Sequence, residues 1–281
     1  MSSLFIPIEQ RAQGVSRRVS IKDLSAAKNA QQKWPMITCY DATTARVFDD
    51  AGFPVLLVGD SAAMVVFGFD STIPITTDDM LPLVGAVVRG SSRALVVADL
   101  PFGTYQESIE QAVATSVRFI KEAGAHAVKL EGGAFVIPQV EALVAFGIPV
   151  MGHLGLTPQS VNQFGGYVVQ GRGEAADQLV ADAIALEKAG AFAIVLEVIP
   201  ADLATRVTEA ISIPTVGIGA GINTDAQVIV WQDLLGLTGG KKARFVKEYA
   251  QLRDIMRESS TKWANDVVSG AYPTIENSYL K

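Results

Sequence analysis

The chain has 281 residues, 49% of them hydrophobic and 25 of them glycine, which suits one large domain with a sizeable core and excludes disorder for most of its length. A formal net charge of −6 disfavours a surface for nucleic acid or anionic membrane, and a single cysteine excludes an internal disulfide framework. Because no apolar run could span a bilayer and "MSSLFIPIEQRAQGVSRR" lacks a secretory apolar segment, we expect a cytoplasmic protein without nucleic-acid or membrane partners.

One sequence phrase recurs along the chain: the end of a helix, a glycine or turn, and an apolar strand closed by a polar residue. Its copies are "DDAGFPVLLVGD", "KEAGAHAVKLEGG", "VAFGIPVMGHLG", "EKAGAFAIVLEV" and "TEAISIPTVGIGAG". The Val, Ile and Leu runs in these copies are typical of strands buried on both faces. With three further apolar runs, the phrase predicts eight strands, at residues 36–41, 55–60, 94–100, 127–131, 149–154, 193–198, 214–219 and 228–232.

Helical patterns separate most of these predicted strands. Apolar residues recur at three- and four-residue spacing over residues 78–91, 107–124 and 174–190. Eight similar strand–helix units favour a closed barrel over a doubly wound open sheet, and no GxGxxG motif follows the first strand. The eighth unit is too short for a full helix after its strand.

We therefore predict an α/β protein with a (β/α)8 TIM barrel as its single domain. The barrel is expected over residues 21–242, after a flexible N-terminal arm at residues 1–20. Residues 243–281 are expected to form a C-terminal helical extension that packs on the barrel or on a neighbouring subunit.

Acidic residues close most of the predicted strands. In this fold the carboxyl ends of the strands form the catalytic face, so these closing residues are the candidates for chemistry. They are Asp41, Asp60, Asp99, Glu131 and Glu197, with His153 near the end of the fifth strand.

Several carboxylates around the mouth of the barrel need positive charge or a bound proton to offset their repulsion. Two like charges about 4 Å apart repel by roughly 4 kcal/mol at an effective dielectric near 20. Oxygen ligands without clustered cysteine or histidine favour a hard cation such as Mg²⁺. The most desolvated carboxylate could instead have a raised pKa, which suits a general base.

Each candidate also has a structural interpretation. Asp41 precedes "ATTARVFDD" and fits a helix N-cap better than a ligand. Asp60 and Asp99 could cap helices, although their matching register favours metal binding. Glu197 could pair with a loop amide, and His153 could hydrogen-bond within the barrel.

Lys129 lies two residues before Glu131, so strand alternation places both side chains on the inward face. Lys129 either neutralises the acids or holds a carboxylate or enolate oxygen of a substrate. The glycine-rich "VGIGAG" raises a rival, a phosphate site at the seventh strand, although an acidic mouth suits a phosphate dianion poorly.

The order of motifs resembles the ketopantoate hydroxymethyltransferase family over roughly residues 19–275. The run includes "VLLVGDSAAMVVFGFDSTIPIT", "VVADLPFGTY", "VKLEGG", "GHLGLTPQS", "GGYVVQGR" and "VLEVIP". "GHLGLTPQS" together with "GGYVVQGR" is the most specific part of this likeness.

The resemblance implies a (β/α)8 enzyme of the phosphoenolpyruvate mutase and isocitrate lyase type. Members of the resembled family transfer a hydroxymethyl group from 5,10-methylenetetrahydrofolate, a co-substrate, to 3-methyl-2-oxobutanoate. The product is 2-dehydropantoate, which leads to pantothenate and coenzyme A. The family assembles as a homo-oligomer, so the resemblance implies a decamer.

The family's residue roles carry over position by position. One Mg²⁺ per subunit is expected on Asp60 and Asp99, with Glu131 in its sphere, and Glu197 is expected to be the catalytic base. The substrate-binding residues implied are Asp60, Ser61, Asp99, Lys129 and His153.

One position departs from the family pattern: Phe69 stands in "GFDST" where the family usually has histidine. Two alternatives remain open at this point. One is a Mg²⁺-dependent lyase that cleaves a C–C bond beside a 2-oxo acid, although such lyases carry a cysteine in a "KKCGH"-like loop. The other is a non-catalytic metabolite-binding barrel, which the intact acidic strand ends disfavour.

Overall fold

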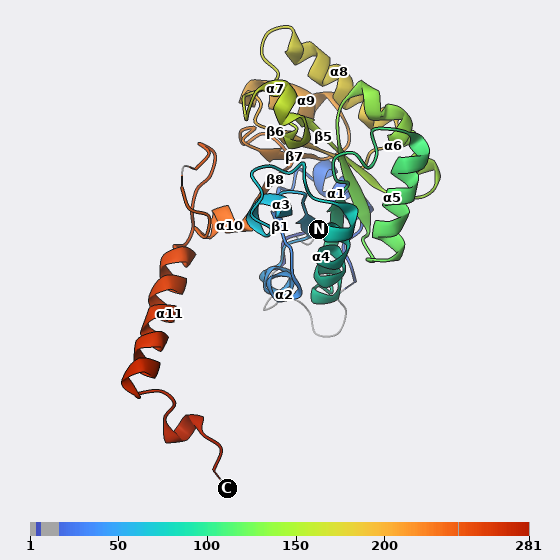
Figure 1. The fold of residues 1–281 in the computed structure, drawn as a ribbon. Helices are drawn as coiled ribbons and strands as arrows, with labels where there is room; N and C mark the ends of the chain where they lie inside the picture. The colour runs from blue at the N-terminus through green and yellow to red at the C-terminus, as the bar shows by residue number, and fades with distance from the viewer. Residues whose placement is uncertain (1–3, 7–16, 241, 281) are drawn as a thin grey trace. The chain divides into compact units, whose positions relative to one another are not determined.

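A closed barrel of eight parallel strands forms the larger part of the chain (Figure 1). The computed structural model describes residues 4–6, 17–240 and 242–280. The strands pair in chain order, and the first closes the barrel against the eighth. They are β1 (Trp34–Thr38), β2 (Val55–Val58), β3 (Leu95–Asp99), β4 (Ala127–Glu131), β5 (Val150–Gly155), β6 (Ala193–Glu197), β7 (Thr215–Ile218) and β8 (Ala226–Ile229).

These strands confirm the predicted (β/α)8 barrel. β1 ends at Thr38 rather than at the predicted residue 41, because the side chain of Asp41 accepts hydrogen bonds from the amides of Thr43 and Thr44 and caps the next helix. β8 begins two residues before its predicted start, at Ala226.

Helices surround the barrel and connect most of its strands (Figure 1). The segment between β7 and β8 contains no helix, so the alternation of strands and helices is interrupted there. The helices of this part are α1 (Ile21–Asn29), α2 (Ala42–Ala51), α3 (Ala62–Val65), α4 (Thr77–Gly90), α5 (Ile109–Lys121), η2 (Ala134–Val136), α6 (Ile137–Ala145), η3 (Pro158–Ser160), α7 (Val161–Phe164), α8 (Ala175–Lys188) and α9 (Ala201–Ala210).

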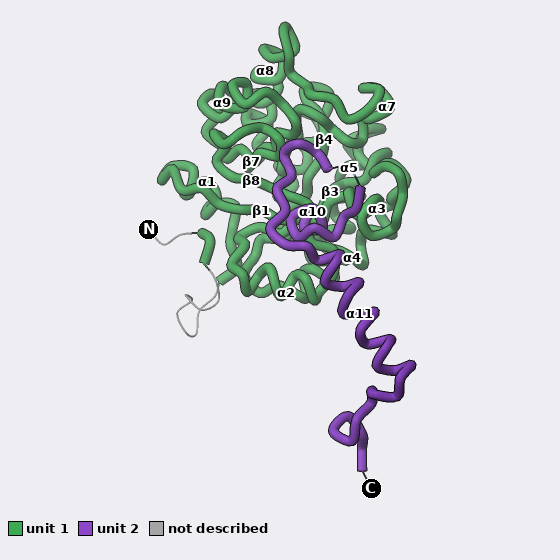
Figure 2. The backbone as a smooth tube through the Cα atoms, turned by 90° about the vertical axis from the view of Figure 1, so that its left-hand side faces the viewer, with its two compact units in different colours: residues 1–230 green, residues 231–281 purple. Residues whose placement is uncertain are grey.

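The chain divides into two compact units, residues 1–230 and residues 231–281 (Figure 2). The second unit contains α10 (Trp231–Leu234), α11 (Leu252–Ser269) and the short η4 (Ile275–Asn277). The predicted division into arm, barrel and extension stays a prediction, and residues 1–3 and 7–16 of the predicted arm lie outside the described residues. Across the described ranges, none of the helices combines the length and the apolar character needed to cross a membrane.

The packing of α4 on α2 depends on a glycine. A Cβ at Gly90 would lie 2.4 Å from the carbonyl oxygen of Ala42 and 2.8 Å from Cβ of Ala45. We expect Gly90→Ala to lower the free energy of unfolding by about 1–3 kcal/mol, because the backbone of α2 cannot yield cheaply. Denaturant unfolding followed by circular dichroism measures this loss.

Gly85 in the same helix provides a matched control. Its added Cβ would meet the flexible end of Arg89 at 3.0 Å. Since alanine is favoured over glycine inside a helix by up to about 1 kcal/mol, Gly85→Ala should be neutral or stabilising. Equal losses in the two variants would contradict the proposed α2–α4 contact as the cause.

Candidate active site

The barrel interior changes from apolar to polar toward the carboxyl ends of its strands. Alternate residues of each strand point inward, and the deeper ones form one buried core cluster, which includes Met36, Leu57, Val97, Ala127, Met151 and Val195. The residues two positions later in the same strands are Thr38, Gly59, Asp99, Lys129, His153 and Glu197. Strand parity therefore aims one layer of functional groups at the mouth of the barrel.

Lys129 and Asp99 form the buried ion pair at the base of this layer. Lys129 Nζ lies 2.9 Å from Asp99 Oδ1, and both residues are at most 4% exposed. The other carboxylate oxygen of Asp99 accepts a hydrogen bond from the backbone amide of Asp60 at 3.0 Å. Asp99 thus fixes both the ammonium group and the turn that carries Asp60.

His153 connects this ion pair to two glutamates. Its Nδ1 lies 3.2 Å from Lys129 Nζ and 3.3 Å from Glu131 Oε1. Its Nε2 lies 3.2 Å from Glu197 Oε2. A continuous line of charged groups therefore runs from Asp99 to Glu197 across the four neighbouring strands β3 to β6.

Glu197 is held by unusual backbone geometry. The next residue, Val198, has a φ of +48°, a strained conformation for a β-branched residue. Gly155 has a φ of +94°, and a Cβ there would lie 2.3 Å from the carbonyl oxygen of Glu197. The strands must approach closely at this point, and the approach places the Glu197 carboxylate beside His153.

The turn after β2 positions Asp60 and Ser61. A Cβ at Gly59 would lie 2.7 Å from Ser61 Oγ and 3.3 Å from Asp99 Oδ2, so only glycine leaves room for these groups. The hydroxyl groups of Ser61 and Tyr40 share a hydrogen bond of 2.9 Å. Ser61 is thereby fixed next to the acidic cluster, where it was predicted to contact substrate.

Gln159 and Tyr105 complete the cluster, although the sequence interpretation missed them. The Gln159 amide donates to Asp60 Oδ2 at 2.9 Å, and its backbone amide donates to Glu131 Oε2 at 3.0 Å. Tyr105 donates to Gln159 Oε1 at 2.7 Å. Both residues lie in motifs that support the family resemblance, Gln159 in "LTPQS" and Tyr105 in "PFGTY". No role was predicted for either residue.

Burial and mutual repulsion shift the pKa values of these groups. Burial, together with the charges of Asp99 and Glu131, raises the pKa of Asp60 well above its usual range. Burial also raises the pKa of Asp99, although Lys129 opposes this shift. Burial alone would lower the pKa of Lys129, but the surrounding carboxylates, with Asp99 first, raise it above its ordinary value.

The pKa of His153 is raised to about 9. Burial and Lys129 lower it, and the carboxylates of Glu131 and Glu197 beside the ring outweigh them. Each ring nitrogen lies within 3.3 Å of one of these carboxylates, and the 3.2 Å contact with Lys129 joins two cations when the ring is protonated. The carboxylates favour the protonated ring because the acidic groups of the cluster outnumber its cations.

The donor set fits a hard divalent cation. Asp60, Asp99 and Glu131 are all buried. Asp99 Oδ1 and Glu131 Oε1 accept no well-oriented hydrogen bond, although a charged neighbour lies near each. Within the described ranges, no group of three or more His, Cys, Asp or Glu side chains could hold a metal ion by itself. Mg²⁺ commonly takes only one or two carboxylates and fills its other positions with substrate and water oxygens.

The whole-chain comparison decides the family. The model of the ketopantoate hydroxymethyltransferase family matches residues 18–275. The chain belongs to the ketopantoate hydroxymethyltransferase family. Relatives named 3-methyl-2-oxobutanoate hydroxymethyltransferase include one from Frankia casuarinae, 63% identical over 93% of this chain and 88% of the relative. Another, from Thermobifida fusca, is 60% identical over 94% of each chain.

Solved structures of lower identity share the barrel of this ketopantoate hydroxymethyltransferase family member. A 2,3-dimethylmalate lyase, described as a PEP mutase/isocitrate lyase superfamily member, aligns with a TM-score of 0.59 at 19% identity and covers 91% of both chains. A phosphonopyruvate hydrolase in complex with oxalate and Mg²⁺ aligns with a TM-score of 0.60 at 13% identity over 92% of both chains. These likenesses establish the fold.

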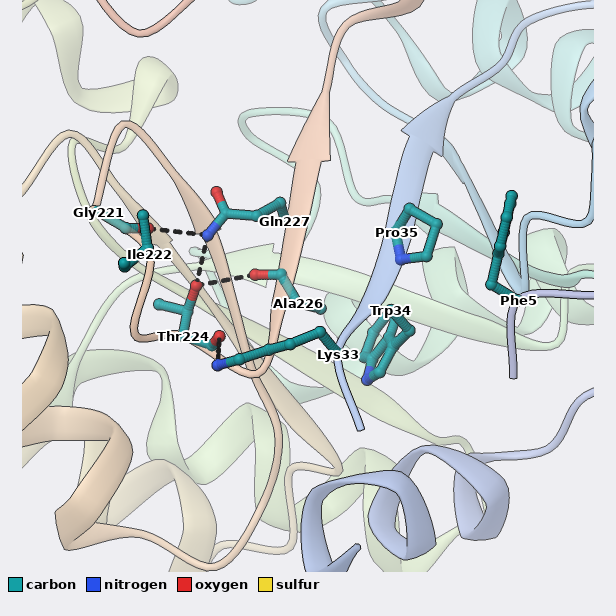
Figure 3. Close-up of a pocket in the computed structure, with 9 residues that line it drawn as sticks. All are labelled: Phe5, Lys33, Trp34, Pro35, Gly221, Ile222, Thr224, Ala226 and Gln227. Atoms are coloured by element: carbon teal, nitrogen blue, oxygen red, sulfur yellow. Dashed lines mark hydrogen bonds between the residues drawn. The ribbon is translucent and has the colours of Figure 1, made fainter. Parts of the chain in front are cut away.

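A second pocket of about 630 Å³ lies at the amino ends of β1 and β8 (Figure 3). Lys33 Nζ donates to the carbonyl oxygen of Thr224 there, and Gln227 Nε2 donates to Gly221 O and Thr224 Oγ1, both at 2.8 Å. These donors are satisfied within the chain and face away from the catalytic end. The acidic cluster is therefore the candidate active site of this family member.

Proposed function

We propose that the acidic cluster binds 3-methyl-2-oxobutanoate and transfers a hydroxymethyl group to it from 5,10-methylenetetrahydrofolate, which gives 2-dehydropantoate. The observation that supports this proposal is the continuous line from buried Asp99 through Lys129 and His153 to the partly buried Glu197. Such a line would offer a fixed ammonium group and a carboxylate base to one substrate. A 2-oxo acid that must lose a proton from C3 needs both groups.

Substrate binding is assigned to the Lys129 side of the cluster. Lys129 is expected to hold the carboxylate and the keto oxygen of the 2-oxo acid, assisted by Ser61 and His153. Asp60 and Asp99 would hold a Mg²⁺ ion, one per subunit, with Glu131 in its sphere. When bound, this ion supplies a Lewis acid that polarises the keto group.

Proton removal is assigned to Glu197. Its carboxylate takes the proton from C3, and the electron pair moves toward the keto oxygen, which Lys129 stabilises as negative charge develops. C3 then forms a bond to the methylene carbon of the folate as the first of that carbon's two bonds to folate nitrogens breaks. Water supplies the hydroxyl group as the second C–N bond breaks. The two nitrogens take up the proton removed from C3 and one proton from the water, which releases tetrahydrofolate.

The lyase alternative has weaker support. The single cysteine, Cys39, is buried, and burial raises the pKa of its thiol to about 11. It lies just after β1, and its backbone amide donates to the carbonyl oxygen of Leu57 in β2, so it belongs to the barrel wall. The chain therefore offers no reactive thiol for the catalytic role that such lyases need.

Hydrogen exchange tests the proposed function. Incubation with 3-methyl-2-oxobutanoate and Mg²⁺ in deuterated water should replace the C3 hydrogen, observed by NMR, and adding the folate should produce 2-dehydropantoate. Without any exchange the proton-abstraction step would be wrong. Exchange without hydroxymethylation would remove the transferase assignment.

Cellular location and assembly remain predictions that accompany this function. We infer a cytoplasmic location and a homo-oligomer, a decamer by family resemblance. Sedimentation analysis of the full chain measures the assembly directly.

A further inference from the structure

Exposed aromatic side chains border the proposed substrate site. Phe67 and Phe69 are each 43% exposed, Tyr167 is 52% exposed, and Met64 is 38% exposed. The three aromatic residues lie on loops that follow β2 and β5, and Met64 lies in the short helix α3 after β2, so all four are at the catalytic end of the barrel. Single exposed apolar residues are ordinary, but a group of them at the entrance of a polar site indicates a ligand.

The two phenylalanines are fixed in a stacked arrangement. Their ring centroids lie 6.4 Å apart with an interplanar angle of 25°. The amide of Phe67 donates to Ala62 O at 3.0 Å, and that of Phe69 donates to Ala63 O at 2.9 Å. Gly68 between them has a φ of +76°, which glycine adopts without strain. The backbone of this segment is therefore ordered by its own hydrogen bonds, and the two rings stack on each other.

Tyr167 reaches the same rim from the other side of the site. Its hydroxyl group lies 3.7 Å from Met64 Sδ. Its loop is tied to the end of β6, because the amide of Gln170 donates to the carbonyl oxygen of Val198, the neighbour of Glu197. Burial, followed by the charges of Glu197 and Asp60, raises the pKa of the Tyr167 hydroxyl. Tyr167 thus lies within electrostatic reach of the proposed base.

The segment that carries Phe67 and Phe69 is also joined to the acidic cluster, through backbone hydrogen bonds to Asp60 and Ser61. The amide of Met64 donates to Ser61 O, and the amide of Ala63 donates to Asp60 O. The aromatic rim and the substrate-binding turn are consequently one continuous piece of chain. A ligand that stacks on the rim would therefore contact a segment that continues directly into the proposed substrate-binding turn.

The chemistry of the donor matches this rim. Methylenetetrahydrofolate has a flat pterin portion and a benzoyl ring next to the reactive methylene carbon, and its glutamate tail is anionic. Aromatic faces attract planar rings, whereas Phe67, Phe69 and Tyr167 carry no cation that would bind the tail. The ring end should therefore enter and the tail should remain outside.

We propose that Phe67, Phe69 and Tyr167 form a stacking platform that binds the ring portion of methylenetetrahydrofolate and directs its methylene carbon toward the 2-oxo acid. This inference rests on the proposed function, since it names the place of that function's second substrate. The three side chains act by positioning the donor and take no part in proton removal.

The double variant Phe67→Leu/Phe69→Leu tests the platform, because leucine preserves apolar bulk but removes the rings. We expect KM for methylenetetrahydrofolate and Kd for tetrahydrofolate, measured by calorimetry, to rise roughly tenfold. C3 exchange of 3-methyl-2-oxobutanoate without folate should keep its wild-type rate. Phe69→Tyr, which retains a ring, should keep the wild-type KM.

Phe146→Leu is the matched control, since Phe146 is 71% exposed but lies at the end of α6 that precedes the amino end of β5. It should change neither exchange nor folate affinity. Unchanged folate affinity in the double variant, or an equal loss of exchange, would overturn the platform. Failure of the wild-type chain to use the folate would instead refute the proposed function, so the two failures are distinguishable.

Discussion

In deuterated water, Glu197→Gln is expected to lower the rate of C3 hydrogen exchange by about 10²–10⁴-fold, the usual contribution of a positioned general base. The amide has nearly the same shape as the carboxylate but cannot accept the proton. Its oxygen can occupy the same place beside His153 Nε2, which lies 3.2 Å from Glu197 Oε2 in the native chain. The loss should therefore reflect chemistry rather than collapse of the site.

Two measurements show whether Glu197 acts as the base. Calorimetric titration with Mg²⁺ should give the wild-type Kd, because the proposed ligands are Asp60 and Asp99. Glu209→Gln, a change of the same type at an exposed position on α9, should leave exchange unaffected. Loss of Mg²⁺ affinity in Glu197→Gln would instead assign that carboxylate to the metal site.

The barrel and its polar rim could be predicted because both follow from local rules. Alternation along a strand fixes which residues share a face, so the separation of Lys129 and Glu131 by two residues was sufficient to place both inside. Burial on both faces of parallel strands produced the apolar runs. The polar residue that closes each run was then set at the catalytic end by the topology alone.

The contacts between loops could not be predicted in the same way. Gln159 lies 99 positions from Asp60 in the chain, yet its amide donates to that carboxylate. No spacing rule relates two loops that different strands carry to one rim. The contact of His153 with Glu197 has the same origin, because it depends on the lateral register of β5 and β6. Side-chain pairing across the rim therefore required the folded structure.

Asp41 shows how a local rule settles an ambiguous residue. It was one of several acids at predicted strand ends, and its position before a helical pattern favoured a cap. The structure confirms the cap, with hydrogen bonds of 2.8 and 2.9 Å to the amides of Thr43 and Thr44. The backbone amide of Asp60 instead donates to the Asp99 carboxylate, and the Asp60 carboxylate accepts from the Gln159 amide, so both residues remain the candidate metal ligands.

Lys129→Met is expected to lower the free energy of unfolding by about 3–5 kcal/mol, the usual cost of removing one partner of a buried ion pair. Lys129 lies 2.9 Å from Asp99, and both side chains are almost completely buried. Without the ammonium group the Asp99 carboxylate is left in a low-dielectric site. Chemical denaturation measures the loss, and Lys22→Met at an exposed position in α1 is the control.

The same variant separates two roles of Lys129. If the ammonium group also holds the oxygens of the 2-oxo acid, Lys129→Met should lower the C3 exchange rate by about 10²–10³-fold and raise the Kd of 3-methyl-2-oxobutanoate. The double variant Lys129→Met/Asp99→Asn removes both charges, so it should recover much of the lost stability without recovering exchange. A folded Lys129→Met protein that binds the 2-oxo acid with the wild-type Kd would leave Lys129 with charge neutralisation alone.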